Sequence, residues 1–258
     1  SKEEISKYLD SLSPQDKERA TGFFTTLRRQ VDGRLSIVPY SVEYQNELQQ
    51  VAGLLREAAA LTAQASLKKY LGLRADALLG CSRTPSGCQP VDYFQSDIAW
   101  MELDSSIEPT LGPYETYEDE LFGYKAAFEA YVTLRDEAET QKLQKFSAQL
   151  QWLEDHLPID EKYRNKALGA YAPIRVVNQL YAAGDGDRGV KTAAFNLPND
   201  ERVIKEKGSK RVMLKNVQES KFNVVLKPIA ALAMNSAAAK NLSFNAFFTH
   251  ILMHELMH

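Results

Sequence analysis

Residues 243–258 read Ser-Phe-Asn-Ala-Phe-Phe-Thr-His-Ile-Leu-Met-His-Glu-Leu-Met-His. Apolar residues recur here three or four positions apart, which is the spacing of one helix face, and Ser243 stands where an N-cap belongs. The stretch ends in His-Glu-x-x-His, which places two histidines about one turn apart on the same face. Both imidazoles can then bind one zinc ion. We therefore predict a helix that carries the zinc ligands His254 and His258.

Glu255 directly follows the first of these histidines. In such a motif its carboxylate can take a proton from a water molecule that the zinc activates and then deliver it to the leaving amine. We therefore predict that Glu255 is the catalytic general base. The alternative is a chance match of packed histidines, but three of the four histidines in the chain lie in its last nine residues. This clustering favours the metal site.

His250 continues the four-residue spacing of the two predicted ligands. It lies roughly 12 Å along the helix from His258, at about 1.5 Å per residue, so one ion cannot be shared between them. We interpret His250 as a core histidine or as a neighbour of the ligands. The third ligand is expected beyond residue 258.

Length and charge limit the classes of partner. A chain of 258 residues can form one large domain or two modest ones. Its net charge of -3 argues against nucleic acid as the main partner, and no apolar run reaches the roughly 20 residues of a membrane span. The predicted zinc helix has no C-terminal stop signal. We therefore expect that this chain is a fragment and that it associates with the remainder of the same polypeptide.

The first third of the chain has helical periodicity. We predict helices over 14–31, with Ser13 as the N-cap, over 41–61 and over 66–79. Residues 80–92 are expected to form a loop that contains Cys81 and Cys88. A disulfide and two free thiols are equally compatible with this loop, so the compartment stays open between cytoplasm and bacterial periplasm.

The rest of the chain mixes strand and helix patterns. Short apolar segments bounded by turn residues predict strands over 98–103, 110–117, 174–180, 190–197 and 211–217. A long helical pattern covers 119–153, either as one helix or as two that bend near Glu137. This order of elements favours an α+β fold with segregated layers.

Three segments in this order resemble the dipeptidyl peptidase III family of zinc metallopeptidases. Residues 112–123, Gly-Pro-Tyr-Glu-Thr-Tyr-Glu-Asp-Glu-Leu-Phe-Gly, resemble that family's Glu-Ser-Tyr-Arg-Asp-Pro-Phe-Gly region. Residues 195–200, Phe-Asn-Leu-Pro-Asn-Asp, resemble its Ile-Asn-Ile-Pro-Asn-Tyr strand, and residues 210–217 resemble the segment that follows it. The subgroup that matches best is bacterial and plant, and its members are often associated with Nudix hydrolases.

The resemblance implies an exopeptidase that removes dipeptides from the N-termini of short peptides, with Zn as its cofactor. It also implies two lobes, a helical zinc-binding lobe and a lobe with a small mixed β-barrel plus helices. We expect the barrel lobe to contain 1–137 and 178–228, and the helical lobe to contain 138–177 and 229–258.

The same resemblance implies roles for four further residues. Tyr117 would stabilise the oxyanion and Glu115 would pair with the substrate's α-amino group, while Asn196 and Asn199 would hold the peptide backbone. The alternative is that Tyr117 is a strand residue and the two asparagines are turn residues beside Pro198.

Two departures from the family pattern are visible. Many members have one more residue between the two histidines than this chain has. In addition, Glu118 stands where the family has arginine, and one residue is inserted before Phe122.

Two alternatives to the peptidase function remain. One is a peptide-binding relative with weak or different amide hydrolysis, and the other is an inactive structural half. No Nudix motif is present in these residues.

Overall fold

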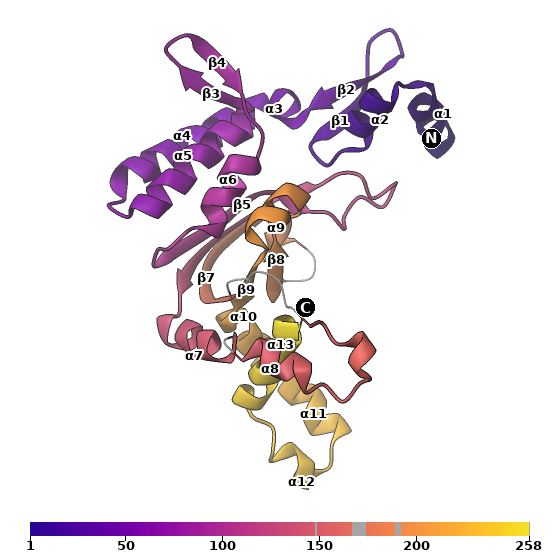
Figure 1. The fold of residues 1–258 in the computed structure, drawn as a ribbon. Helices are drawn as coiled ribbons and strands as arrows, with labels where there is room; N and C mark the ends of the chain where they lie inside the picture. Colours follow the sequence, from indigo (N-terminus) through magenta and orange to yellow (C-terminus); the bar gives the residue numbers. More distant parts are fainter. Residues whose placement is uncertain (148, 167–173, 189–191, 258) are drawn as a thin grey trace. The chain divides into compact units, whose positions relative to one another are not determined.

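The structure, a computed structural model, describes residues 1–147, 149–166, 174–188 and 192–257. It divides into two compact units (Figure 1). Unit 1 comprises Ser1–Asp104, Thr110–Ala130 and Ala183–Arg188, and unit 2 comprises Ser105–Pro109, Tyr131–Ala182 and Gly189–His258. The lobe boundaries expected from the sequence stay a prediction.

The N-terminal part of unit 1 contains two short helices and a hairpin. Helices α1 (Lys2–Ser11) and α2 (Pro14–Thr21) are followed by strands β1 (Thr25–Arg29) and β2 (Leu35–Pro39), which pair antiparallel. The prediction of one helix over 14–31 is therefore wrong beyond Thr21. The β-branched pair Thr25-Thr26 and the turn at Gly33, whose φ is 83°, favour a hairpin over a longer helix.

The next two predicted helices are confirmed. After the single turn of α3 (Tyr40–Glu43), helix α4 (Gln45–Leu61) packs against α5 (Ala65–Leu79). Gly80 ends α5 in the left-handed region, with a φ of 62°. This helical pair forms much of the core of unit 1.

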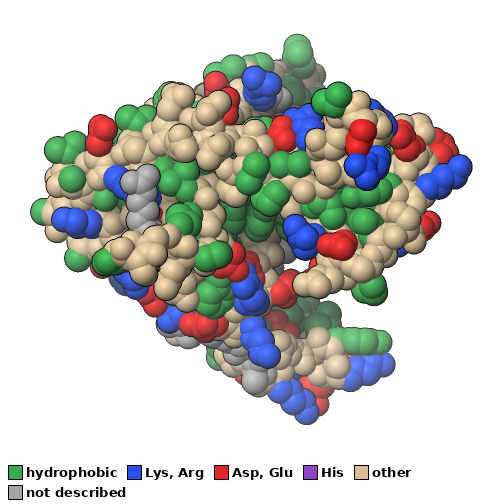
Figure 2. All heavy atoms as spheres, turned by 90° about the horizontal axis from the view of Figure 1, so that it is seen from above, with side chains coloured by type: hydrophobic (Ala, Val, Ile, Leu, Met, Phe, Trp, Pro, Cys, Tyr) green, Lys and Arg blue, Asp and Glu red, His purple; other side chains and the backbone are tan. Residues whose placement is uncertain are grey.

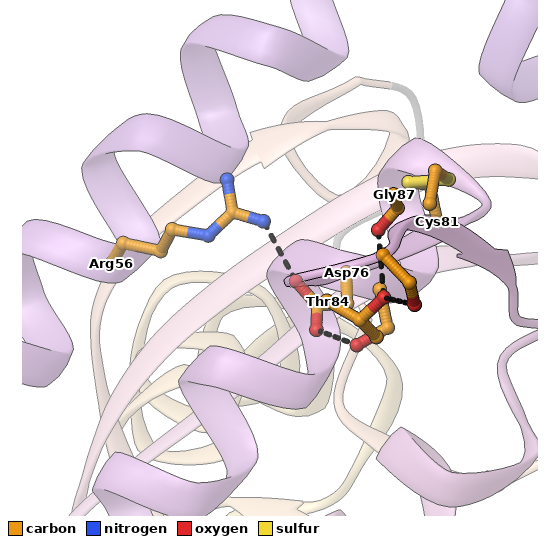
Figure 3. The surroundings of a disulfide bond; sticks show 8 residues. Arg56, Asp76, Cys81, Thr84 and Gly87 are labelled. Carbon is orange, nitrogen blue, oxygen red and sulfur yellow. Dashed lines mark hydrogen bonds and ion pairs between the residues drawn. A yellow bond between two sulfur atoms is a disulfide. The ribbon is translucent and has the colours of Figure 1, made fainter.

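The expected loop at 80–92 is a hairpin closed by a disulfide. Strands β3 (Cys81–Thr84) and β4 (Gly87–Pro90) pair antiparallel, and Cys81 is bonded to Cys88. The carboxylate of Asp76 on α5 accepts a hydrogen bond from Arg56 of α4 at 2.7 Å (Figure 3). It accepts another from the Ser82 hydroxyl at 2.9 Å. The base of the hairpin is thus linked to both helices.

The strand predicted over 98–103 is a helix. Helix α6 (Phe94–Met101) buries every residue from Ser96 to Met101, and the indole of Trp100 donates a hydrogen bond to Thr110 at 3.1 Å. A short, fully buried apolar run does not distinguish helix from strand by its periodicity. Here the tertiary environment decides the conformation.

The described residues form a mixed sheet of five strands. Its order is β5 (Ile107–Glu115), β6 (Ala127–Arg135), β7 (Ile174–Gly184), β9 (Lys210–Leu214) and β8 (Ala194–Leu197). Strand β9 is parallel to β7 and antiparallel to β8. This curled sheet with helices around it confirms the predicted α+β class.

The helix predicted over 119–153 is wrong in its first half. Residues 127–135 form β6, in which Glu129, Tyr131 and Thr133 are buried and alternate with more exposed neighbours. This period of two is the strand pattern, and it outweighs the helical spacing of the aromatic residues. Helix α7 (Glu137–Ser147) begins at the residue near which a bend was expected, directly after β6 ends at Arg135, and α8 (Leu150–Asp155) follows it.

The C-terminal part of unit 2 is mostly helical. Helices α9 (Glu201–Lys207), α11 (Lys227–Ala233) and α12 (Ser236–Ala239) lie outside the predicted elements. The strand expected over 211–217 ends at Leu214, and its last three residues begin helix α10 (Lys215–Lys221) instead. Helix α13 (Phe244–Met257) is confirmed, and Ser243 is its N-cap, accepting the Ala246 N–H at 3.1 Å.

Charged side chains of both signs are interspersed on the face drawn in Figure 2. In the view of Figure 2, lysines and arginines lie among acidic and apolar side chains without a broad patch of one sign. None of the helices in the described ranges is long and apolar enough to cross a membrane.

Substitution of Gly184 tests the packing at the end of β7. Its φ is 65°, and an added Cβ would lie 2.3 Å from the Phe128 carbonyl oxygen. We expect Gly184→Ala to lower the free energy of unfolding by about 1–3 kcal/mol or more, because left-handed strain and the steric clash add up. Chemical denaturation measures this change.

Gly53→Ala is the matched control, because no described atom outside the adjoining residues and backbone of α4 lies within 4 Å of a Cβ built at this position. We expect it to stabilise the protein by about 0.5–1 kcal/mol. Equal effects of the two substitutions would contradict the described packing.

Candidate functional site

Helix α13 is anchored to the sheet of unit 2 by one face. Phe248 and Leu252 form a core with Ile174 and Val176 of β7 and Met213 of β9. Residues three to four positions apart share a helix face, so the buried face is fixed by these two side chains. Phe244, Ile251 and Met253 are partly buried and also pack against this core.

His250 and His254 are exposed on α13. The interpretation of His250 as a core histidine is therefore wrong, and it shares the outward face with His254. The side chain of Glu255 and the whole of His258 lie outside the described residues. Since the helix continues to Met257, the spacing of the motif up to that point is helical, as predicted.

A metal ion fits the donor set of this helix. An imidazole on an outward face, with a second one expected four positions later, matches the ligands that zinc prefers. Within the described ranges no group of three or more His, Cys, Asp or Glu side chains is arranged to hold a metal. The assignment of His254 and His258 as zinc ligands stays a prediction.

Asn196 lies on the same face of the sheet as the contacts of α13. In the register of the strands, Asn196 pairs with Arg211 and Arg211 pairs with Ile174, and cross-strand partners share a face. Ala194, two residues earlier on β8, packs against the α13 core. Strand β8 ends the strand order of the sheet, and both Asn196 and Asn199 are exposed. Asn196 is thus a strand residue and not part of a turn.

Glu115 and Tyr117 lie together in unit 1, at the end of β5. The Glu115 carboxylate accepts the Tyr117 backbone N–H at 2.5 Å, and the Tyr117 side chain is 88% exposed. Tyr117 follows the strand, which ends at Glu115, so it is not a strand residue. The structure thus brings Glu115 and Tyr117 together in unit 1, and places Asn196, Asn199 and His254 in unit 2.

The segment after Tyr117 is held by Asp119. Its carboxylate accepts backbone N–H groups from Leu121, Tyr124 and Lys125 at 3.0, 2.8 and 3.2 Å. Burial alone would raise the pKa of Asp119, but these hydrogen bonds outweigh it and the pKa lies below its ordinary value. No role was predicted for Asp119 from the sequence, although aspartate commonly accepts the backbone N–H two residues on in turns, as it does here from Leu121.

An apolar cavity of about 330 Å³ lies in unit 1, apart from these residues. Its walls come from α4, α5 and three strands, and include Tyr44, Leu48, Val51, Leu78 and Phe128. Neither Glu115 nor Tyr117 lines it. The cavity is therefore not part of the candidate site.

The amino-acid sequence was compared with models of known protein families. A sequence model described as peptidase family M49 matches residues 17–258. The chain belongs to peptidase family M49. The resemblance noted from the three sequence segments is thereby confirmed.

Solved structures of two M49 relatives are similar over the whole chain. Dipeptidyl-peptidase III from Corallococcus sp. strain EGB is 60% identical with a TM-score of 0.86, over 100% of this chain and 46% of that one. DPP III from Caldithrix abyssi is 47% identical with a TM-score of 0.91, over 99% and 47%. The chain thus spans about half the length of these relatives.

A curated plant protein is also similar. Nudix hydrolase 3 of Arabidopsis thaliana is 40% identical over 277 residues, which cover 100% of this chain and 34% of the plant protein. Its name agrees with the subgroup expected from the sequence.

Substitution of Asp119 tests how the Tyr117 segment is held. A carboxyl whose pKa is lowered in the folded state adds stability above its unfolded pKa of about 3.9, and this is lost as the pH falls through the folded pKa. We expect Asp119→Ala to cost about 1–3 kcal/mol at pH 7, because several backbone N–H donors, those of Tyr124 and Lys125 part-buried, lose their charged acceptor. Denaturation at several pH values should show this cost shrinking below about pH 4.

Asp10→Ala is the control, because Asp10 is exposed and pairs only with Lys17 among the described contacts. Its cost should stay under about 1 kcal/mol. An Asp119→Ala cost that is equally small, or that grows in acid, would contradict this account.

Proposed function

We propose that the full-length protein is a zinc-dependent exopeptidase that removes dipeptides from peptide N-termini. The observation that carries the proposal is helix α13 in a chain of family M49. One face of this helix is buried through Phe248 and Leu252, and its motif histidine His254 is exposed. A helix held in this way can present metal ligands without moving.

His254 and His258 would hold the zinc ion, together with a third ligand from outside this chain. When bound, zinc polarises the scissile carbonyl and lowers the pKa of water towards about 7. Glu255 would take the proton from the attacking water and pass it to the leaving amine. The other proposed residues bind and orient the peptide around this step.

Tyr117 would donate its phenol hydrogen to the oxyanion that develops on the scissile carbonyl. Its high exposure supports this role, because a residue that meets substrate has to be accessible. Glu115 would bind the free α-amino group of the peptide through a charge-assisted hydrogen bond. Since the Glu115 carboxylate also accepts the Tyr117 backbone N–H, it is anchored to the backbone of the residue that carries the phenol.

Asn196 and Asn199 would hold the backbone of the peptide. Strand β8 ends the strand order of the sheet, and a peptide can add to such an edge through main-chain hydrogen bonds with little demand on its sequence. Asn196 shares the face of the sheet on which α13 packs, which supports a substrate path alongside the zinc helix.

The remainder of the full-length polypeptide is the partner that we propose for unit 2. Helix α11 is apolar on every side except at Lys227, yet only Ala230 is buried. Ile229 and Leu232 are 56% and 91% exposed. An all-apolar helix normally lies in a core, and the solved relatives are about twice as long as this chain. Their additional length is the natural cover for α11.

The activity is tested on the full-length protein with an arylamide of a dipeptide. We expect chelation to abolish release of the arylamine and zinc to restore it. Glu255→Gln should lower kcat by about 10²–10⁴-fold, the contribution of a general base. Glu219→Gln, an exposed glutamate of α10, is the control and should change nothing. Full activity after chelation, or in the Glu255 variant, would refute the proposal.

Tyr117→Phe tests the oxyanion role separately. Removal of one oxyanion donor is expected to lower kcat by about 10²–10³-fold. KM should change little, because the interaction forms in the transition state. Tyr163→Phe removes the hydroxyl of another exposed tyrosine and serves as control. A rise in KM alone would assign Tyr117 to ground-state binding instead.

A further inference from the structure

A buried charged cluster in unit 1 ends at the residue before Glu115. Arg74 of α5, Asp97 of α6 and Tyr114 of β5 are 0%, 2% and 6% exposed. The Arg74 guanidinium donates to Asp97 and, at 2.5 Å, to the Tyr114 hydroxyl, which itself donates to Asp97 at 2.5 Å. Two helices and a strand are therefore joined at the Tyr114 side chain.

The surroundings of Arg74 keep this geometry fixed. Its guanidinium carbon lies 5.5, 5.3 and 5.3 Å from the ring centroids of Tyr70, Tyr93 and Tyr114, within the range of cation–π attraction. Burial raises the pKa of Tyr114 well above its ordinary value, so its hydroxyl stays a hydrogen-bond donor. Neither partner can rotate away without losing charge-assisted contacts in a dry environment.

Gly112 provides the space for this cluster. A Cβ at this position would lie 3.0 Å from the Tyr114 ring and 3.1 Å from the Arg74 guanidinium. The glycine thus lets the arginine approach strand β5 closely.

Stability alone does not explain such a pair. The cost of removing two charges from water often equals or exceeds their attraction, and apolar residues of similar volume are commonly as stable. A buried ion pair does, however, select one arrangement of the elements that carry it. Here the pair fixes the end of β5 relative to α5 and α6. Glu115 is the last residue of β5, and Tyr117 follows it.

The segment that follows is held at both of its ends. Tyr114 fixes the end at β5, and Asp119 fixes the other through its backbone hydrogen bonds. Between them, the Glu115 carboxylate accepts the Tyr117 N–H. If the cluster shifts, the Glu115 carboxylate therefore shifts with it. In the proposed function this carboxylate binds the substrate amine.

We infer that Arg74 and Asp97 act, through Tyr114, as positioning residues for Glu115, and so set the preference of the site for a peptide with a free N-terminal amine. This inference rests on the proposed function. In enzymes a misplacement of about 1 Å can lower the rate on the order of 100-fold. We therefore expect that removal of one hydroxyl from the cluster measurably weakens binding of the free amine.

The test is the ratio of two dissociation constants, for a tripeptide with a free amine and for its N-acetylated form. Calorimetry measures both on the full-length protein, with Glu255→Gln added to prevent cleavage. Tyr114→Phe should reduce the preference for the free amine by roughly 10-fold. Asp97→Asn provides a second variant with the same expected direction.

Thr110→Val is the matched control. It also removes one buried hydroxyl from β5, which accepts the Trp100 indole, but four positions before Tyr114. It should lower the melting temperature without changing the ratio.

An unchanged ratio in Tyr114→Phe, or an equal fall in Thr110→Val, would overturn the inference while leaving the proposed function in place. A parent protein with no preference for the free amine would instead remove the proposed role of Glu115, and the inference with it.

Discussion

The candidate site depends on one contact, the packing of α13 on strands β7 and β9. Phe248 and Leu252 are buried against Ile174, Val176 and Met213, and this fixes the rotation of the helix about its axis. With that rotation fixed, His254 faces away from the core. The same sheet face continues through β9 to Asn196 on β8, so that one apolar core orients both the proposed metal ligands and the proposed peptide-binding strand.

The sequence predicted those parts of the fold whose signals are local. Helix α13 has a regular apolar stripe and a serine N-cap, and both are present in the structure. The prediction was wrong where two patterns compete. Residues 127–135 contain aromatic residues at helical spacing, but the sheet selects their alternation instead. In α6 a buried apolar run carries no usable period, and only its packing decides that it is helical.

The residues of the candidate site likewise fall into two groups, those that local sequence patterns predict and those that only the fold brings together. The His-Glu-x-x-His motif and the segment around Tyr117 are contiguous, so the sequence alone led to them. Arg74, Asp97 and Tyr114 are separated by 23 and 17 positions, and no local pattern connects them. Similarly, the shared face of Asn196 and the α13 core follows from strand register, which the fold determines and the sequence does not show.

The central claim is that α13 supplies zinc ligands from its outward face. The most direct measurement is an anomalous difference map, recorded at the zinc absorption edge from crystals of the full-length protein. We predict a single zinc peak at about 2.0–2.1 Å from imidazole nitrogens of His254 and His258, with a third protein ligand from outside this chain. Zinc bound elsewhere in an active protein, or a His254 imidazole that makes no metal contact in it, would contradict the account.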